Sequence, residues 1–339
     1  MSNSKRSFMP TEVIFATTSA CNLSCQHCFT SKSSQKLNTK DAVRFLETCR
    51  NTTIEKVGFS GGGEPFLYTE FLEDVIKSAV KNDFMFDRIM TNGDWWNKAP
   101  ILNATLQKIY DAGYDGKIGL SWDAFHGQDF NRICVFIQEV LEVFGGESLV
   151  IQSVISTEQT QIMGIPSERD LMLFNFHQLA EHFGLTFDAE FDKKTGRGFA
   201  RLQGSAKLAR GEEYIFIPIY IEKQTFDSTD ERAWQSGTWF KDDYCEGPGQ
   251  ILFVHPTGDI APCCGFANEE KNLFIGTIKD TYEQVLKKAN SNAMVELCYK
   301  KGLSTKIKQM EEQEITFPLN GKTDDLCTFC QFVCRQESL

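Results

Sequence analysis

The first 190 residues alternate short β-favouring runs with helical patterns, and this alternation limits the possible folds more than any other feature. Strands are predicted over residues 12–19, 55–62, 86–93, 116–125, 148–157 and 185–191. Helices are predicted between them, over residues 40–49, 68–80, 99–113, 129–144 and 167–184. Strands that alternate with helices form parallel βαβ units. The pattern therefore predicts an α/β fold with a parallel sheet.

The segment 129–144 shows the helical pattern most clearly. Its apolar residues recur at i, i+3, i+4 and i+7 and form one stripe, which includes Cys134. We interpret Cys134 as a core residue, and Cys49 and Cys298 in the same way because their contexts are similar. After residue 191 the pattern changes: residues 213–222 predict one more strand, and a domain boundary is expected near 225–243.

Twelve cysteines are many for 339 residues, and they are clustered. Clustered cysteines in a large chain indicate metal ligands rather than disulfides, and so a reducing compartment. Cys21, Cys25 and Cys28 follow the first predicted strand in a C-x-x-x-C-x-x-C spacing. One alternative is a zinc site completed by another ligand such as His27. The other is a 4Fe–4S cluster with three protein ligands, which leaves one iron open for a small molecule.

Composition narrows the possible partners. The net charge of -11 argues against non-specific binding to nucleic acid, but it is compatible with a basic peptide or an amino sugar. No apolar run approaches the length of a membrane span, and the N-terminal stretch has no apolar signal region. We expect a cytoplasmic protein with neither nucleic acid nor membrane as partner.

The cysteine spacing after the first strand, with the aromatic Phe29 next to the last cysteine, resembles the radical S-adenosylmethionine (SAM) superfamily. In that family the open iron of a 4Fe–4S cluster chelates the amino and carboxylate groups of SAM. An electron from the cluster cleaves SAM to methionine and a 5′-deoxyadenosyl radical, which abstracts hydrogen from the substrate. The resemblance implies a partial (β/α)6 TIM-like barrel over residues 10–200, with Cys21, Cys25 and Cys28 as ligands of the SAM-binding cluster.

Motifs at the ends of later strands extend the resemblance. The sequence SGGGEP at 60–65 resembles the GGEP motif, where glycine allows the backbone to approach the ligand closely. TNG at 91–93 is frequent in the family, SWDAFH at 121–126 resembles its S-x-D motif, and DFNR at 129–132 resembles D-x-x-R. The guanidinium of Arg132 suits a carboxylate, although a solvated helix residue fits that position equally. The resemblance thus assigns to SAM the residues Gly62, Gly63, Glu64, Pro65, Asn92, Ser121, Asp123 and Arg132.

A second group of cysteines lies in the C-terminal third of the chain. On spacing alone it fits a zinc ribbon or treble clef. It also resembles the SPASM and twitch extensions of the same superfamily, which hold auxiliary 4Fe–4S clusters. This implies an extension over residues 242–339, with 201–241 as an insertion or linker. One auxiliary cluster is expected, because only six cysteines remain and two of them are adjacent. The ligand set is Cys245, Cys263, Cys327 and Cys330, with Cys334 as a possible replacement for one of them.

Cys264 is left over beside an implied ligand. One interpretation is a packed small residue. The other is a catalytic hydrogen-atom donor that quenches a substrate radical, which would suit an epimerase.

The resemblance implies a radical SAM enzyme of the oxidoreductase or isomerase type. Its cofactors would be SAM and two 4Fe–4S clusters, and its partner an electron donor such as flavodoxin or ferredoxin. We favour maturation of a ribosomal peptide by cross-linking, epimerisation or oxidation. A dehydrogenase or epimerase acting on a sugar, aminocyclitol or nucleoside-like metabolite is the alternative. Because the first cysteine is residue 21, we expect no fused leader-binding domain, which favours either a small-molecule substrate or a peptide delivered by a separate protein. A non-catalytic zinc or iron–sulfur scaffold is the competing class, against which the motifs at successive strand ends argue.

Overall fold

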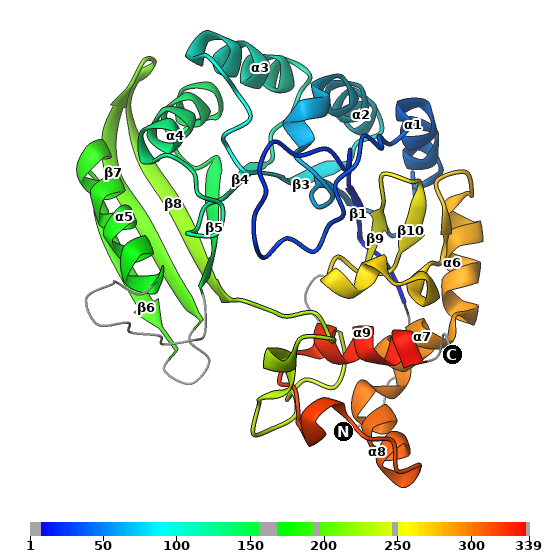
Figure 1. Ribbon diagram of the computed structural model, residues 1–339. Coiled ribbons are helices and arrows are strands. Elements are labelled where there is room, and N and C mark those ends of the chain that lie inside the picture. Colours follow the sequence, from blue (N-terminus) through cyan, green and yellow to red (C-terminus); the bar gives the residue numbers. More distant parts are fainter. Residues whose placement is uncertain (1–7, 156–167, 193–196, 246–249, 337–339) are drawn as a thin grey trace, which may run out of the picture. The chain divides into compact units, whose positions relative to one another are not determined.

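The computed structural model of this chain describes residues 8–155, 168–192, 197–245 and 250–336 (Figure 1). The chain forms two compact units, neither of which is continuous in sequence. The central unit comprises Thr17–Ser34 and Gly58–Gln224, and the C-terminal unit comprises Met1–Ala16, Gln35–Val57 and Thr225–Leu339. The three-part division into 10–200, 201–241 and 242–339 stays a prediction from the sequence.

The strands of the central unit lie in the order β3-β4-β5-β8-β7-β6. Their bounds are β3 Met85–Thr91, β4 Lys117–Ser121, β5 Leu149–Ile155, β6 Thr186–Phe191, β7 Gly198–Leu208 and β8 Gly211–Lys223. The pairs β3–β4, β4–β5 and β5–β8 are parallel, whereas β8–β7 and β7–β6 are antiparallel. The strand that continues the parallel series after β5 is therefore β8. The predicted sixth strand, β6, lies at the edge, because β6, β7 and β8 form two successive hairpins.

The helices of the central unit connect its parallel strands. They are η1 Pro65–Tyr68, α2 Thr69–Lys81, α3 Ala99–Asp111, α4 Phe130–Phe144 and α5 Glu168–Phe183. Helices α2, α3 and α4 lie along the same side of strands β3 to β5 (Figure 1). The Asp129 side chain caps α4 by accepting from the Arg132 amide, and the apolar stripe of α4, including Cys134, is buried as predicted.

The C-terminal unit contains a second set of strands. Strands β1 (Glu12–Phe15) and β9 (Ile251–Val254) pair in parallel, and β10 (Asp259–Ala261) pairs antiparallel with both β9 and β11 (Gly276–Thr277). Strand β2 (Lys56–Phe59) crosses the division between the units. The parallel pairings and intervening helices of the chain confirm the α/β class.

Mostly short helices follow strands β9 to β11 in the C-terminal unit. The helices of this unit are α1 Thr39–Thr48, η2 Glu231–Trp234, η4 Phe266–Glu269, η5 Lys271–Leu273, α6 Tyr282–Ser291, α7 Ala293–Glu296, the π-helical η6 Leu297–Lys301, α8 Leu303–Glu312, η7 Pro318–Asn320 and α9 Leu326–Gln336. Over the described residues, no helix has the length and apolar character needed to cross a membrane.

Candidate cofactor-binding site

The first cysteine cluster lies in the loop 17–34 of the central unit. Cys21 and Cys25 are half-buried and Cys28 is exposed. The amide of Cys28 donates to the carbonyl of Cys25 at 3.2 Å, so the backbone turns between these two residues. Three thiols in one exposed loop can reach a cluster without any rearrangement of the core.

The GGGEP loop after β2 packs directly on this cysteine loop. The amide of Gly63 donates to the Thr18 carbonyl at 2.5 Å, and the amide of Glu64 donates to the Ala20 carbonyl at 2.8 Å. A Cβ atom added to Gly63 would lie 1.8 Å from the Ala20 carbonyl oxygen. This close approach of two backbones requires glycine at position 63.

Glu64 ties the GGGEP loop to the end of β3. Its carboxylate is buried, and Oε1 accepts from the Phe66 amide at 3.1 Å and from the Thr91 hydroxyl at 2.8 Å. Oε2 accepts from the Asn92 amide at 2.8 Å. Burial raises the pKa of Glu64 to about 7, against the effect of these hydrogen bonds. Both carboxylate oxygens are used within the protein, and its predicted role toward SAM, like those of Gly62 and Pro65, stays a prediction.

Asp123 is the centre of a hydrogen-bonded turn after β4. Its Oδ1 accepts from the amides of Phe125 and His126, and it lies 2.8 Å from His126 Nδ1. Its Oδ2 accepts from the Val154 amide at 3.3 Å. The His126 ring also hydrogen-bonds with the thiol of Cys25. Burial lowers the pKa of His126, but its hydrogen bonds with Asp123 and Cys25 raise it to about 9.

His27, Asp123 and His126 place three ligand-type atoms within 4.8 Å of one another. A transition-metal ion bound at about 2.1 Å would need its ligand atoms roughly 3 Å apart and free of other donors. The Asp123 carboxylate instead accepts the hydrogen bonds of the turn. We therefore interpret these residues as a hydrogen-bonded wall next to Cys25 rather than as a metal site.

The other predicted SAM residues lie around the loop after β3. The Ser121 carbonyl accepts from Gln128 Nε2 at 2.7 Å. Arg132 is half-buried and paired within the protein: its Nε pairs with Asp94, its Nη2 donates to the Trp96 carbonyl, and its guanidinium lies 4.0 Å from the centre of the Trp96 ring. Arg132 thus fastens this loop to the start of α4, and its contact with the SAM carboxylate stays a prediction.

Buried polar atoms without a hydrogen-bond partner gather in the same region. They lie in the cysteine loop, after β3 and β4, and in β5: Thr17 Oγ1, His27 Nδ1, Trp95 Nε1, Gln128 Oε1 and Ser153 Oγ. Buried polar groups in native proteins are nearly always hydrogen-bonded, so such a group of atoms points to a polar ligand. The donor and acceptor mixture fits a molecule such as SAM, and the adjacent thiols fit an iron–sulfur cluster.

The second cysteine group is assembled inside the C-terminal unit. Burial raises the pKa of Cys263 well above its usual value, and the nearby thiols of Cys245, Cys327 and Cys264 raise it further. Cys327 lies so close to Gly265 that a Cβ there would be 2.7 Å from the Cys327 sulfur. Helix α9 carries Cys327, Cys330 and Cys334, with Cys330 hydrogen-bonded to Cys334. A group of buried and half-buried thiols of this kind fits a thiolate-bound cluster.

Cys298 belongs to this group, which the sequence did not indicate. Its sulfur lies 3.7 Å from the sulfur of Cys330, and its carbonyl accepts from the Cys245 amide at 3.4 Å. The next residue, Tyr299, donates to the Pro262 carbonyl at 2.6 Å and hydrogen-bonds with the Cys245 thiol. Both residues lie in the π-helical segment η6, and single π-helical turns are frequent at functional sites.

Cys264 is half-buried and packs against an apolar cluster of Ile14, Ala16, Ile251 and Phe253. This contact fits the interpretation as a packed residue, and its proximity to Cys263 and Cys327 also leaves the hydrogen-donor hypothesis open. The catalytic role stays a prediction.

The spacing of the thiols bears on the zinc alternatives. Four thiolates on one zinc ion lie about 3.8 Å apart, because Zn–S bonds are about 2.3 Å long. Across the described ranges, no three cysteine sulfurs lie within 4.8 Å of one another. Thiolates on the separate iron atoms of a cluster lie farther apart than thiolates on one zinc ion, so this spacing is compatible with a cluster.

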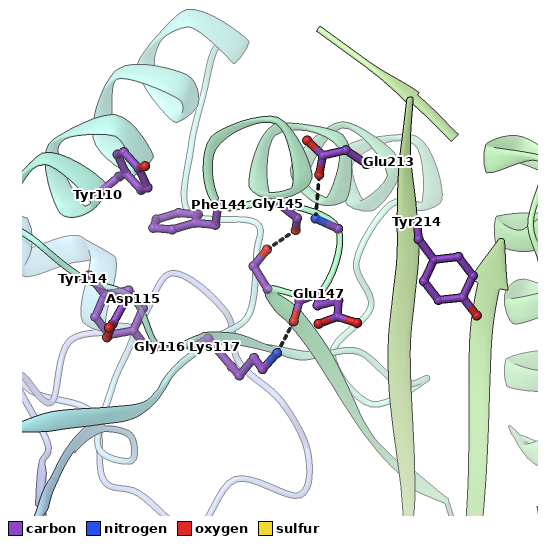
Figure 2. A pocket seen from close by; sticks show the side chains of 12 residues that line it. Tyr110, Tyr114, Asp115, Gly116, Lys117, Phe144, Gly145, Glu147, Glu213 and Tyr214 are labelled. Atoms are coloured by element: carbon purple, nitrogen blue, oxygen red, sulfur yellow. Dashed lines mark hydrogen bonds between the residues drawn. The ribbon is translucent and has the colours of Figure 1, made fainter. Parts of the chain in front are cut away.

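A pocket of about 490 Å³ lies elsewhere in the central unit (Figure 2). Gly116, Lys117 and Ser148 line it at the amino ends of β4 and β5, together with Tyr110 and Phe144. Ligands of parallel α/β sheets bind at the carboxyl ends of the strands, which is where the cysteine loop and the GGGEP loop lie, whereas this pocket lies at the amino ends. We therefore do not assign the candidate site to this pocket.

Known proteins with similar sequences match the N-terminal part of the chain, which contains the cysteine loop. A family model described as a 4Fe-4S single cluster domain matches residues 12–122. An S-adenosylmethionine-dependent nucleotide dehydratase from Siniperca chuatsi is 41% identical over 71 residues, 20% of this chain and 20% of that protein. A GTP 3',8-cyclase from Chlorobaculum tepidum is 29% identical over 124 residues, 36% of this chain and 35% of that protein. These matches and the motifs at successive strand ends support the radical SAM superfamily for the matched N-terminal part of the chain. The matches span only about a fifth and a third of the lengths of these two relatives.

A solved structure, described as native anSMEcpe with bound AdoMet and Cp18Cys peptide, is similar in fold over nearly the whole chain. It aligns with 96% of this chain and 95% of its own, with a TM-score of 0.54 and 14% identity. At this identity the likeness concerns the fold alone. The alignment confirms the predicted TIM-like α/β fold, and the chain carries the predicted cysteine-rich C-terminal region.

Proposed function

We propose that this protein reductively cleaves SAM and abstracts hydrogen from an unactivated C–H bond of a peptide. One observation carries the proposal: the three-cysteine loop lies beside the buried polar atoms without partners at Thr17, His27, Trp95, Gln128 and Ser153. A cluster bound by the loop would supply the electron, and SAM held against those atoms would supply the radical.

The residues of the chain would have distinct tasks. Cys21, Cys25 and Cys28 would bind the SAM-binding 4Fe–4S cluster. Gly62 and Gly63 would expose backbone groups to SAM, while Glu64 holds their loop against the end of β3. Asp123 would hold His126 against Cys25 and so keep the cysteine loop in place.

The second cluster would be separate and bound only by protein. Cys245, Cys263, Cys327 and Cys330 would be its ligands, with Cys334 as the replacement, and it would transfer electrons. This proposal is supported by the group of buried and half-buried thiols in the C-terminal unit. A small electron-transfer protein such as flavodoxin or ferredoxin would reduce the enzyme.

A peptide is the favoured substrate, and we expect the enzyme to cross-link, epimerise or oxidise it. The solved structure with the similar fold is described with a bound peptide, and the net charge of -11 favours a cationic peptide over a polyanion. A nucleotide-like metabolite is the second candidate, because both curated relatives are named for reactions of nucleotides.

Anaerobic reconstitution with iron and sulfide tests the proposal. About eight irons per chain, an EPR signal that changes on adding SAM, and 5′-deoxyadenosine on adding dithionite are expected. Cys21→Ala/Cys25→Ala/Cys28→Ala should abolish 5′-deoxyadenosine and keep about half of the iron. Cys245→Ala or Cys327→Ala should remove up to one cluster and retain uncoupled SAM cleavage. Reductive SAM cleavage by the triple variant would refute the proposal, and zinc without charge-transfer absorption would support a scaffold.

Isotope transfer distinguishes the substrate classes. A perdeuterated basic peptide and perdeuterated GTP would each be incubated with SAM and reductant. Deuterium in 5′-deoxyadenosine identifies the class from which hydrogen is abstracted, and transfer from GTP alone would overturn the peptide assignment.

A further inference from the structure

The side chain of Asn92 is held in one orientation in the loop after β3. Its backbone amide donates to Glu64 Oε2 at 2.8 Å, and its carbonyl accepts from Gln128 Nε2 at 2.6 Å. Its side-chain Oδ1 accepts from the Asp94 amide at 2.8 Å. Because Oδ1 is committed to Asp94, the amide nitrogen Nδ2 must point the other way.

That nitrogen carries two N–H groups, and both have acceptors. One donates to Asn22 Oδ1 at 3.0 Å, and the other donates to the sulfur of Cys21 at 3.8 Å. Asn22 is fixed in turn, since its Nδ2 donates to the Asp94 carbonyl at 3.0 Å. A flipped Asn92 amide would put oxygen against oxygen at Asn22 and nitrogen against the N–H of Asp94. The network therefore determines that Asn92 presents a donor to Cys21.

The contact between Asn92 and the Cys21 sulfur is shielded from solvent. Asn92 is only 7% exposed, so water competes weakly for its N–H groups and the hydrogen bond is stronger than it would be at the surface. Both donors of the side chain are used by Cys21 and Asn22. Unless one of these bonds opens, neither remains for SAM, which changes the role that the family resemblance implies for this residue.

We infer that Asn92 is a positioning residue that raises the reduction potential of the cluster bound by Cys21, Cys25 and Cys28. Reduction places additional negative charge on the cluster and its thiolates. A fixed N–H dipole aimed at the Cys21 sulfur stabilises that charge more in the reduced state than in the oxidised state. This inference rests on the proposed function, because it concerns the cluster that the function requires.

Two variants of the reconstituted full-length protein test the effect. Asn92→Leu has similar volume and removes the donor without adding charge. Asn92→Asp keeps an acceptor for the Asp94 amide but replaces the donor with a carboxylate oxygen. In an EPR-monitored redox titration of the SAM-responsive signal, Asn92→Leu should lower the ratio of reduced to oxidised cluster at a fixed potential about three- to tenfold. For a one-electron couple this is about 30 to 60 mV. Asn92→Asp should lower the reduction potential further than Asn92→Leu does.

Asn22→Ala is the matched control. It removes the second acceptor of Asn92 and loosens the same loop, but it leaves the contact between Asn92 and Cys21 intact. The potential of this variant should stay that of the wild type. An equal shift in Asn22→Ala and Asn92→Leu would show that loop geometry, and not donation to sulfur, sets the potential, and would overturn the inference.

A measurement that leaves Asn92 in place covers the case in which the Asn92 variants fail to assemble the cluster. Protein labelled with ¹⁵N at the asparagine side chains would be reduced and examined by pulsed EPR. A ¹⁵N coupling that persists in Asn22→Ala is expected, and its absence would refute the inference. A wild-type protein with no SAM-responsive cluster would refute the proposed function itself, which separates the two failures.

Discussion

The sulfur of Cys298 lies 3.7 Å from the sulfur of Cys330, on the π-helical segment η6 and helix α9 of the C-terminal unit. Both side chains are buried, and Cys334 hydrogen-bonds with Cys330 from the next turn of the same helix. A cluster bound through Cys330 would therefore have spare thiols within reach of the same iron.

The first prediction concerns this redundancy. Cys330→Ala should retain part of the auxiliary iron, because Cys298 can move into the vacated position. Cys298→Ala/Cys330→Ala should lose up to one full cluster, about four irons. Iron and sulfide analysis of the reconstituted proteins measures both. Cys134→Ala, a buried cysteine of α4 in the central unit, is the control and should retain all iron. Identical iron content in the single and double variants would show that Cys298 takes no part.

The second prediction concerns the packing of two backbones. In Gly63→Ala the new methyl group would lie 1.8 Å from the Ala20 carbonyl oxygen, so the cysteine loop must shift. We expect SAM binding by the reconstituted protein to weaken at least tenfold, and folding to lose about 1–3 kcal/mol. Calorimetric titration with SAM and circular dichroism measure the two effects.

Gly237→Ala is the matched control for this substitution. Gly237 has no atom within 4 Å of its added Cβ and lies in an exposed part of the C-terminal unit. Its SAM affinity should equal that of the wild type. Wild-type affinity in Gly63→Ala as well would mean that the two loops separate easily and that their contact does not shape the site.

The sequence predicted the elements of the central unit well, because each depends on local periodicity. The stripe of the segment 129–144 locates α4 within one residue at its start, and the fold buries the same face. Pairing between distant strands has no such local signal. The position of β8 beside β5 depends on two hairpins that bring residues 211–223 back into the sheet, so the sequence predicted β6 in its place.

In the candidate site as well, features that are close in sequence were predictable and contacts between distant residues were not. The cysteine motifs were visible because their ligands are close in sequence, as Cys21 and Cys25 are. Cys298 had no such spacing, since a single cysteine in a helical context is indistinguishable from a packed residue. Arg132 had a motif, but its partner Asp94 lies on another loop, and only the fold shows that pair.

The third prediction concerns Cys264, which packs on an apolar cluster beside the auxiliary thiols. If its thiol donates a hydrogen atom to a substrate radical, a thiyl radical remains, which one electron from the auxiliary cluster and one proton from solvent would restore to the thiol. Cys264→Ser should then stop turnover while 5′-deoxyadenosine formation continues. In deuterium oxide the wild-type product should gain one deuteron at an inverted stereocentre, because thiol protons exchange with solvent. Cys49→Ser is the control, because Cys49 is fully buried at the end of α1, and it should keep wild-type turnover. A product lighter by two hydrogens would instead make the auxiliary cluster the electron acceptor and leave Cys264 as a packed residue.

The last prediction uses the buried carboxylate of Glu64. Burial raises its pKa to about 7 in the folded protein, whereas a glutamate in the unfolded chain has a pKa of about 4.3. Between these values the folded state binds more protons than the unfolded state, so stability falls as the pH rises from about 4.3 to 7 and is level above that. The total loss of folding free energy is about 2–4 kcal/mol.

The variant Glu64→Gln cannot titrate at this position, and its missing acceptor for the Asn92 amide lowers its stability by a constant amount at every pH. The wild type should therefore melt well above Glu64→Gln at pH 5, and the gap should narrow by pH 8. Thermal unfolding of both proteins across this range measures the difference, and a gap that is constant with pH would mean that Glu64 is ionised throughout.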